Sequence, residues 1–417
     1  MIDLLFILFY IASGWIFFQL VFPFLTVAAA RVFGQRSEAH LGAKIQDKFA
    51  DASAATLDTD FACIITAYKN SEITKPLVAS LLQQSHPNLM VYLVADECPE
   101  TAFNITDPRF VLLKPENPLR LKIKSIQYAH SRFVRAHDFT VIFDADNLAH
   151  PDFLHQINQY IARGFQCVQG QRTAKNLDSK YAAADSLGEL YKNYIERYAP
   201  YLLGGSSVIS GSGMATASGL YQQYLDSKAV QEGQHLGKKM LQEDKILQNF
   251  LLRRNVRIAF AWDAVCYDEK VSTGEDVQTQ RGRWLFSYFQ NIPNALGILL
   301  RGLVRFSPNQ FFFGVVTLAL PMFIQLAVAF MLAVAGLLIQ PWITLALVGA
   351  VGIFGMNVLW TLKLSEAPPS VWNAVYAIPK FILRQARGLF KMVNPEKHFK
   401  HSEHRHLVHV DEVIKKQ

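Results

Sequence analysis

The chain has 417 residues, longer than one average domain, so a folded core with at least one further element is expected. Hydrophobic residues make up 51% and charged residues 18%, which excludes a disordered chain and a uniformly apolar one and favours a water-exposed domain joined to lipid-facing segments. The net charge of +7 is explained by basic residues beside apolar segments and in the tail; no nucleic-acid motif accompanies it, so membrane lipids and not nucleic acid are the expected partner.

Three apolar segments are long enough to cross a membrane: residues 2–30, 311–338 and 342–362. The first contains an acidic residue near its start and is too long for a cleaved signal peptide, so it is expected to span. The other two are separated by Ile339-Gln340-Pro341, which is typical of a tight turn. They are therefore expected to form a helical hairpin.

Basic residues flank the ends of these segments. Arg31 follows the first, Arg305 precedes the second and Lys363 follows the third. Because Lys and Arg near the ends of a span favour the cytoplasmic side, the middle of the chain and the tail are expected in the cytoplasm. The sequence thus predicts an integral membrane protein, which we expect in a bacterial inner membrane.

From about Asp60 the pattern changes to short apolar runs that alternate with helical stretches. Strands are predicted at residues 61–66, 89–95, 110–113 and 139–143, and helices at residues 75–84 and 122–136. This alternation predicts an α/β fold with a mixed, mostly parallel sheet covered by helices. Ligands of such sheets bind beyond the carboxyl ends of the strands, so the residues there are the candidates for a site.

Polar residues follow three of the predicted strands. Tyr68 lies after the first, Asp96 after the second and Asp144-Ala145-Asp146 after the fourth. Two carboxylates on either side of a small residue suit a hard divalent cation, Mg²⁺ or Mn²⁺, which also binds phosphate oxygens. Solvated loop aspartates often produce the same spacing, and it is the position at a strand end that favours a metal site.

Two further motifs have both a structural and a catalytic interpretation. Gln242-Glu243-Asp244 begins an amphipathic stretch, where the helix dipole favours an acidic residue. Alternatively, Asp244 is a general base that takes a proton from an attacking hydroxyl. Gln280-Arg281-Gly282-Arg283-Trp284 precedes an expected interfacial helix, where Arg and Trp commonly anchor to headgroups.

Taken in chain order, Asp96, Asp144-Ala145-Asp146, Gln242-Glu243-Asp244 and Gln280-x-x-Arg283-Trp284 resemble the motifs of the membrane-bound family 2 glycosyltransferases. That family includes the cellulose, chitin, hyaluronan and poly-N-acetylglucosamine synthases. The resemblance extends from about residue 61 to residue 362. It implies a GT-A fold, a nucleotide-sugar donor and a required Mg²⁺ or Mn²⁺ ion.

The resemblance also implies a role for each matching residue. The donor-binding positions are Thr66, Ala67, Tyr68, Asp96, Lys122, Asp144, Gln280, Arg283 and Trp284. The acceptor-binding positions are Gly211, Ser212, Gly213, Glu243 and Trp284. The metal ligands are Asp144 and Asp146, and the catalytic base is Asp244.

The chain departs from the family pattern in three places. The family's first loop commonly has Pro-Ala-Tyr-Asn-Glu, where this chain has Thr66-Ala67-Tyr68-Lys69-Asn70. Ala217 and Ser218 stand where an Arg often follows the acceptor-side loop. A single apolar segment precedes the middle domain, fewer than in some polymer synthases, so the resemblance does not imply a self-contained translocation pore.

These observations divide the chain into six regions. They are an N-terminal transmembrane helix (residues 1–30), a linker (31–59), a cytoplasmic GT-A domain (60–284), an interfacial helix (285–308), a transmembrane hairpin (309–363) and an interfacial, basic tail (364–417). The tail mixes aromatic and basic residues between 371 and 392, which suits a helix lying in the membrane interface.

The leading hypothesis is an inverting transferase that moves a sugar from a UDP-sugar to a growing β-linked polysaccharide at the cytoplasmic membrane face. Export or accessory subunits are further candidate partners. The alternative is a non-processive enzyme that adds one sugar to a lipid or short glycan acceptor. A catalytically inactive scaffold or export component is a third hypothesis, which the acidic residues at all of the expected places disfavour.

Overall fold

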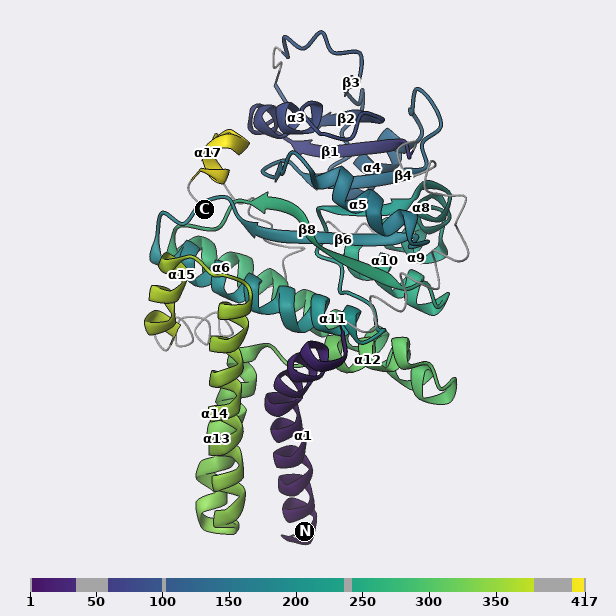
Figure 1. Ribbon diagram of the computed structural model, residues 1–417. Coiled ribbons are helices and arrows are strands. Elements are labelled where there is room, and N and C mark those ends of the chain that lie inside the picture. The colour runs from purple at the N-terminus through teal and green to yellow at the C-terminus, as the bar shows by residue number, and fades with distance from the viewer. Residues whose placement is uncertain (1, 35–58, 100–102, 236–241, 379–406, 416–417) are drawn as a thin grey trace.

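The structure is a computed structural model that describes residues 2–34, 59–99, 103–235, 242–378 and 407–415. A domain built around one sheet lies above three long helices, with a layer of further helices between them (Figure 1). The predicted tail between residues 379 and 406 and most of the predicted linker lie outside the described residues. The predicted fold class is confirmed, because the sheet is mixed and four of its seven strand pairings are parallel.

The sheet has eight strands in the order β3-β2-β1-β4-β7-β6-β8-β5. The strands are β1 (Phe61–Tyr68), β2 (Leu89–Asp96), β3 (Phe110–Leu113), β4 (Phe139–Asp144), β5 (Leu148–Ala149), β6 (Cys167–Ala174), β7 (Met214–Ala217) and β8 (Ile258–Asp268). The four strands predicted from sequence are β1 to β4, which form the parallel half of the sheet. Antiparallel β7 joins them to the half made by β6, β8 and β5.

The helices and turns of helix follow in chain order. They are α1 (Ile2–Ala29), η1 (Ala30–Gly34), η3 (Glu72–Thr74), α3 (Lys75–Leu82), α4 (Lys122–His130), α5 (Phe153–Ala162), α6 (Lys180–Lys192), η4 (Asn193–Tyr198), α7 (Ala199–Leu202), α8 (Ser218–Leu225), α9 (Lys228–His235), α10 (Glu243–Arg253), α11 (Gly274–Val304), α12 (Pro308–Leu318), α13 (Met322–Ile339), α14 (Pro341–Leu364), α15 (Pro369–Ala374), η5 (Val375–Ala377) and α17 (Val410–Ile414).

Both faces of the sheet are covered. Side chains from α3 and α5 pack on one face, and side chains from α4, α8 and α10 pack on the other. The central strands β1 and β2 are therefore buried on both sides, which is why their sequences are continuous apolar runs and not alternating ones. The helix predicted at residues 122–136 ends earlier, at His130.

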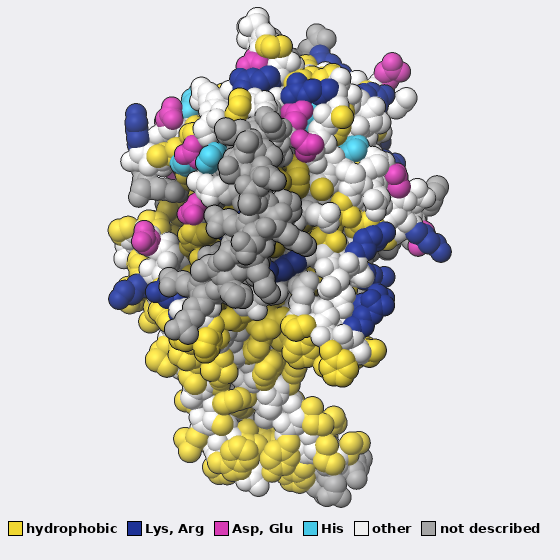
Figure 2. All heavy atoms as spheres, turned by 45° about the vertical axis from the view of Figure 1, so that its right-hand side comes forward, with side chains coloured by type: hydrophobic (Ala, Val, Ile, Leu, Met, Phe, Trp, Pro, Cys, Tyr) yellow, Lys and Arg dark blue, Asp and Glu magenta, His cyan; other side chains and the backbone are white. Residues whose placement is uncertain are grey.

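Three helices are long and apolar enough to cross a membrane: Leu4–Gly34, Met322–Ile339 and Pro341–Leu364. The prediction that residues 311–338 form one span is corrected, because residues 308–318 form the separate helix α12. The chain breaks before Pro321, which has no backbone N–H and keeps the preceding residue out of the helical region. Figure 2 shows the hydrophobic side chains of the lower part as a continuous apolar surface below the charged domain.

The boundary predicted between residues 284 and 285 falls inside one helix. α11 is continuous over 31 residues from Gly274 to Val304, so the expected interfacial helix begins at least ten residues earlier than predicted. α11 packs along α12, α6 packs on α14 through Tyr191 and Phe354, and η4, which continues α6, contacts α1. The intermediate layer in Figure 1 thus joins the sheet to the apolar helices.

Candidate active site

The ends of three neighbouring strands bring the first candidate residues together. Thr66 of β1 lies opposite Asp144 of β4 on one side, and Tyr68 lies opposite Asp96 of β2 on the other. All of these pairings are parallel, so the three strands deliver their last residues to the same edge of the sheet. Ligands of such sheets bind at this edge, beyond the carboxyl ends of the strands.

Asp96 is buried and bound to the loop before α4. Its two carboxylate oxygens accept the backbone N–H groups of Leu119, at 2.9 Å, and Arg120, at 2.6 Å. Arg120 in turn binds Glu97 at 2.8 Å and has a positive φ of 55°. The loop is thereby held in a conformation that a non-glycine residue rarely adopts, and this loop leads directly into Lys122.

Lys122 contacts three separate parts of the candidate site, and we call it the hub of the site. Its ammonium donates to the Asp144 carboxylate at 2.6 Å and to the Gly211 carbonyl at 2.9 Å, and it lies 3.1 Å from the Glu243 carboxylate. These partners come from β4, from the loop before β7 and from the start of α10. One side chain therefore joins predicted donor-side and acceptor-side residues that are far apart in the sequence.

The ionisation of these groups follows from burial and from their partners. Burial opposes the charged form of all three, but the Lys122 ammonium and the Arg172 guanidinium lower the pKa of Asp144 below its ordinary value. Against the same burial, the carboxylates of Asp144 and Glu243 raise the pKa of Lys122. Burial raises the pKa of Glu243, and the neighbouring Asp244 adds to this effect.

Asp244 lies against the glycine-containing loop. Gly211 has a φ of +85°, and a Cβ atom placed on it would lie 3.7 Å from the Asp244 Cβ. Gly213 has a φ of +61°, and a Cβ atom there would lie 2.9 Å from the Cys266 Cβ. A larger residue at position 213 would collide with β8, so this glycine is needed for both conformation and space.

Asp146 lies beside the half of the sheet made by β6, β8 and β5. It is 9% exposed, and its carboxylate accepts the backbone N–H of Glu269 at 3.3 Å. Its carbonyl accepts the Lys175 ammonium at 2.9 Å. Asn147 closes the turn that carries both aspartates, because its side-chain oxygen accepts the backbone N–H of Asp144 at 3.0 Å.

Two of the carboxylates suit a metal ion that is bound only partly by protein. In the part of the chain that the structure describes, no group of three or more His, Cys, Asp or Glu side chains could hold a metal ion. Asp144 and Asp146 on one turn do suit Mg²⁺ or Mn²⁺ completed by water and ligand phosphates, which is how Mg²⁺ is commonly bound.

The second sheet half carries buried charges that were not among the predicted site residues. Arg172 of β6 binds the Asp268 carboxylate and donates to the Ser210 carbonyl at 2.8 Å. Lys270 lies 3.0 Å from Asp268 and 3.8 Å from Glu189 of α6. These residues lie near the carboxyl ends of β6 and β8, where ligands of such sheets bind. They were missed because neither strand was predicted from the sequence.

The last motif lies on α11 and contacts α6. The Trp284 ring lies 4.5 Å from the Arg281 guanidinium carbon and 5.5 Å from the Lys192 ammonium, and Arg281 binds Asp185 of α6. The Gln280 side-chain oxygen is buried without a hydrogen-bond partner among the described residues. Arg281 and Trp284 thus join this motif to α6.

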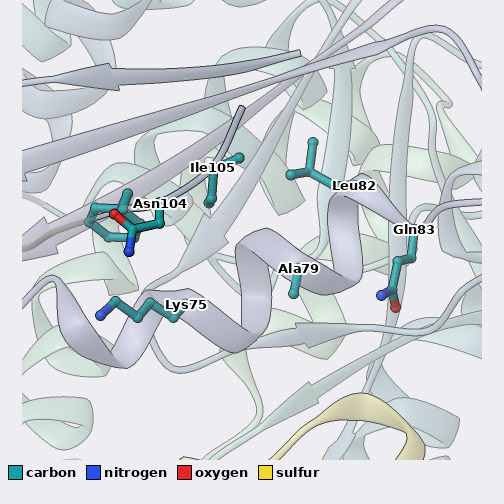
Figure 3. A pocket seen from close by; sticks show the side chains of 7 residues that line it. Lys75, Ala79, Leu82, Gln83, Asn104 and Ile105 are labelled. Carbon is teal, nitrogen blue, oxygen red and sulfur yellow. The ribbon is translucent and has the colours of Figure 1, made fainter. Parts of the chain in front are cut away.

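A separate cavity of about 450 Å³ lies over α3. Figure 3 shows the residues that line it, which include Lys75, Ala79 and Leu82 of α3, Gln83 directly after α3, and Asn104 and Ile105. None of the predicted site residues lines it. It is therefore not part of the candidate active site.

The site lies within a region that matches a known family model. Residues 59–287 match the model described as "Glycosyltransferase like family 2". This region contains every predicted site residue. No curated protein sequence matches the chain significantly.

Solved structures with some similarity are also glycosyltransferases. TarS of S. aureus is 16% identical with a TM-score of 0.38, over 58% of this chain and 40% of TarS. A mannosyltransferase from Pyrobaculum calidifontis, solved with GDP-Man and Mn²⁺, is 15% identical with a TM-score of 0.46, over 83% of this chain and 97% of that one. Glucosyl-3-phosphoglycerate synthase from Mycobacterium tuberculosis is 15% identical with a TM-score of 0.33, over 53% and 76%.

Proposed function

The chain belongs to the family 2 glycosyltransferases, and we propose that it is an inverting enzyme that transfers a sugar from a UDP-sugar to a hydroxyl group of a β-linked glycan. One observation carries the proposal: the Lys122 ammonium binds Asp144, the Gly211 carbonyl and Glu243 together, next to Asp244. A cationic side chain and carboxylates from distant segments thus share one site, as transfer from a nucleotide diphosphate requires.

In this proposal each group has one task. Asp244 accepts the proton of the acceptor hydroxyl, whose oxygen forms a bond to the anomeric carbon while the bond to the diphosphate oxygen breaks. A single displacement inverts the configuration at that carbon. Lys122 stabilises the negative charge that develops on the departing diphosphate, and Gly211 lets the acceptor approach the backbone closely.

The proposed positions of the donor and the metal are based on the residues at the strand ends and on α11. Asp144 and Asp146 would hold Mg²⁺ or Mn²⁺ together with the diphosphate, and the ion would supply Lewis-acid stabilisation when bound. Thr66, Ala67, Tyr68 and Asp96 lie at the neighbouring strand ends, where the nucleoside would bind. Gln280, Arg283 and Trp284 would line the diphosphate and acceptor end from α11.

The membrane orientation is part of the proposal. Arg31 and Lys363 lie at the ends of the apolar helices that adjoin the sheet domain, and the opposite end of the hairpin has Gln340 and Pro341. Basic residues near span ends favour the cytoplasm. We therefore place the sheet domain on the cytoplasmic face of the membrane, as expected for the inner membrane of a bacterium.

Polymer synthesis is the first candidate for the overall reaction, supported by the Gln280-x-x-Arg283-Trp284 motif. A second candidate, addition of one sugar to a lipid or short glycan, is favoured by the packing of the apolar helices. α1 packs on α13 and α14 through Phe9, Ile16 and Leu347, and the buried Gln19 and Gln325 side chains bind the backbone of Leu320. The three described spans thus pack closely on one another, which suits a membrane anchor.

The test is a donor screen on membranes that contain the protein, with UDP-sugars and Mg²⁺ or Mn²⁺, followed by mass analysis of the product. We expect metal-dependent release of UDP, and Asp244→Asn should lower kcat by roughly 10²–10⁴-fold, the usual contribution of a general base. A variant with wild-type kcat would overturn the assignment of Asp244. A product extended by many sugars supports the first candidate, and a single added sugar supports the second.

A further inference from the structure

The end of the chain packs against the sheet. Val410 and Val413 of α17 are each 4% exposed and pack on Leu148, which is 1% exposed, and Tyr267, which is 4% exposed. Figure 1 shows α17 beside the end of β8, although more than 130 residues of sequence separate them. α17 therefore covers the outer strand of the sheet, because β5 is the last strand in the sheet order.

This contact lies directly beside Asp146. Leu148 begins β5 two residues after Asp146 and pairs with Tyr267 in antiparallel register. The chain continues from Tyr267 to Glu269, whose backbone N–H donates to the Asp146 carboxylate at 3.3 Å. A movement of the β5–β8 pair therefore moves both the chain that carries Asp146 and the group that binds its side chain.

Neither β5 nor α17 is expected to be stable without the contact between them. β5 has two residues, so few ladder hydrogen bonds hold it to β8. α17 has five residues, far fewer than an isolated helix needs in water. The apolar contact between them thus stabilises both the edge of the sheet and the helix.

The contact between α17 and the edge of the sheet is apolar. The residues packed around Val410 and Val413 are Leu148, Tyr267, Val265 and Val408. Burial of these side chains is what holds α17 against the β5–β8 pair.

We propose that residues 407–415 are a clamp that holds the β5–β8 pair and thereby positions Asp146 for a complex of a nucleotide with a divalent cation. Val410 and Val413 are positioning residues, because they act on Asp146 through Leu148 and Tyr267. The proposal rests on the proposed function for its purpose, since it assigns the segment to the same metal and diphosphate site.

The chain offers a matched pair of substitutions on one helix. Val413 is 4% exposed, and its neighbour Ile414 is 37% exposed. Val413→Asp places a charge in the apolar contact, and Ile414→Asp makes the same chemical change at the surface. Hydrogen exchange of the full-length protein without metal should rise in peptides that cover residues 144–150 and 265–270 in Val413→Asp only. Unchanged exchange at these peptides would overturn the clamp whatever the protein's activity.

A second measurement tests the consequence for the metal site. The Mn²⁺ concentration for half-maximal UDP binding should rise at least tenfold in Val413→Asp, and less in the milder Val413→Ala, which keeps the test open if the aspartate variant does not fold. An unchanged Mn²⁺ requirement despite increased exchange would show that the segment stabilises the sheet edge only and would overturn its positioning role. Failure of the wild-type protein to bind any UDP-sugar would count against the proposed function, and hydrogen exchange would still decide whether the clamp exists.

Discussion

Two regions of the molecule bind charged side chains in different ways. Near the carboxyl ends of β1, β2 and β4, Asp144 and Glu243 bind one shared partner, Lys122, whose side chain is 24% exposed. In the layer below, around α6 and the end of β8, Glu189 and Lys270 are 11% and 3% exposed and are paired with each other. The first region keeps its charges available to a ligand, whereas the second uses its charges to join elements.

The difference separates a reactive site from a structural one. Removing a partner at Lys122 alters a site that solvent and ligand can reach. Removing Glu189 leaves the Arg197 guanidinium, 2.9 Å away, without its carboxylate in the protein interior, and leaves the Lys270 ammonium with Asp268 alone. Loss of stability is therefore expected below the sheet, and loss of activity with a retained fold is expected at its edge.

The largest expected effect is on stability, at Glu189. Glu189→Ala should lower the free energy of unfolding by about 3–5 kcal/mol, because breaking a buried ion pair leaves an uncompensated charge. The thermal midpoint of the detergent-solubilised protein should fall by roughly 10 °C. Glu232→Ala is the control, because Glu232 pairs with Lys228 at the surface, where ion pairs contribute about 0–1 kcal/mol. Equal midpoints for the two variants would remove the distinction between the two regions.

The next effect is on catalysis, at Lys122. Lys122→Met keeps the aliphatic stem and removes the charge, so kcat/KM for the donor should fall by roughly 10²–10³-fold, as for loss of a group that stabilises the leaving charge. The control is Lys124→Met, an exposed lysine on the same helix. Initial rates of nucleotide release measure both. A Lys122→Met enzyme with the control's kcat/KM would show that the hub is structural.

The same two regions show how far the sequence predicts the structure. β1 to β4 were predicted because each is a compact, mostly apolar run, and the structure brings Asp144 and Glu243 to Lys122 and places Asp244 beside Gly211. β6 was not predicted, because most of it, from Gln169 to Ala174, contains Arg172 and has the pattern of a polar segment. The burial of Arg172 depends on Asp268, which lies 96 residues later.

Tertiary contacts also explain why predicted boundaries differ. The helix predicted to residue 136 ends at His130, and the following chain binds β2 instead, because the Tyr92 hydroxyl accepts the backbone N–H of Val134 at 3.1 Å. α11 extends back to Gly274 because its first turns pack against α6 through the Arg281–Asp185 pair. Each of these two contacts joins segments that are far apart in the sequence, so no local sequence pattern indicates it.

The smallest expected effect is a pH dependence of stability that originates away from both regions. Burial lowers the pKa of His137 below its ordinary value of 6.5, although Asp60 opposes this. The ring is held by a polar contact as well, because the Tyr92 hydroxyl, which accepts the backbone N–H of Val134, lies 2.8 Å from His137 Nε2. Burial therefore makes protonation of His137 less favourable in the folded protein than in the unfolded chain.

The sign of the effect follows from the protons bound in each state. Below about pH 6.5 the unfolded chain protonates His137 while the folded chain resists it, so the unfolded state binds more protons and stability falls as the pH falls. The thermal midpoint should decrease on the order of a few degrees between pH 7 and pH 5. The decrease should be smaller in His137→Gln and unchanged in the control His155→Gln, whose side chain is exposed on α5. An equal decrease in all three proteins would show that His137 does not contribute, and that the acid sensitivity arises at other groups.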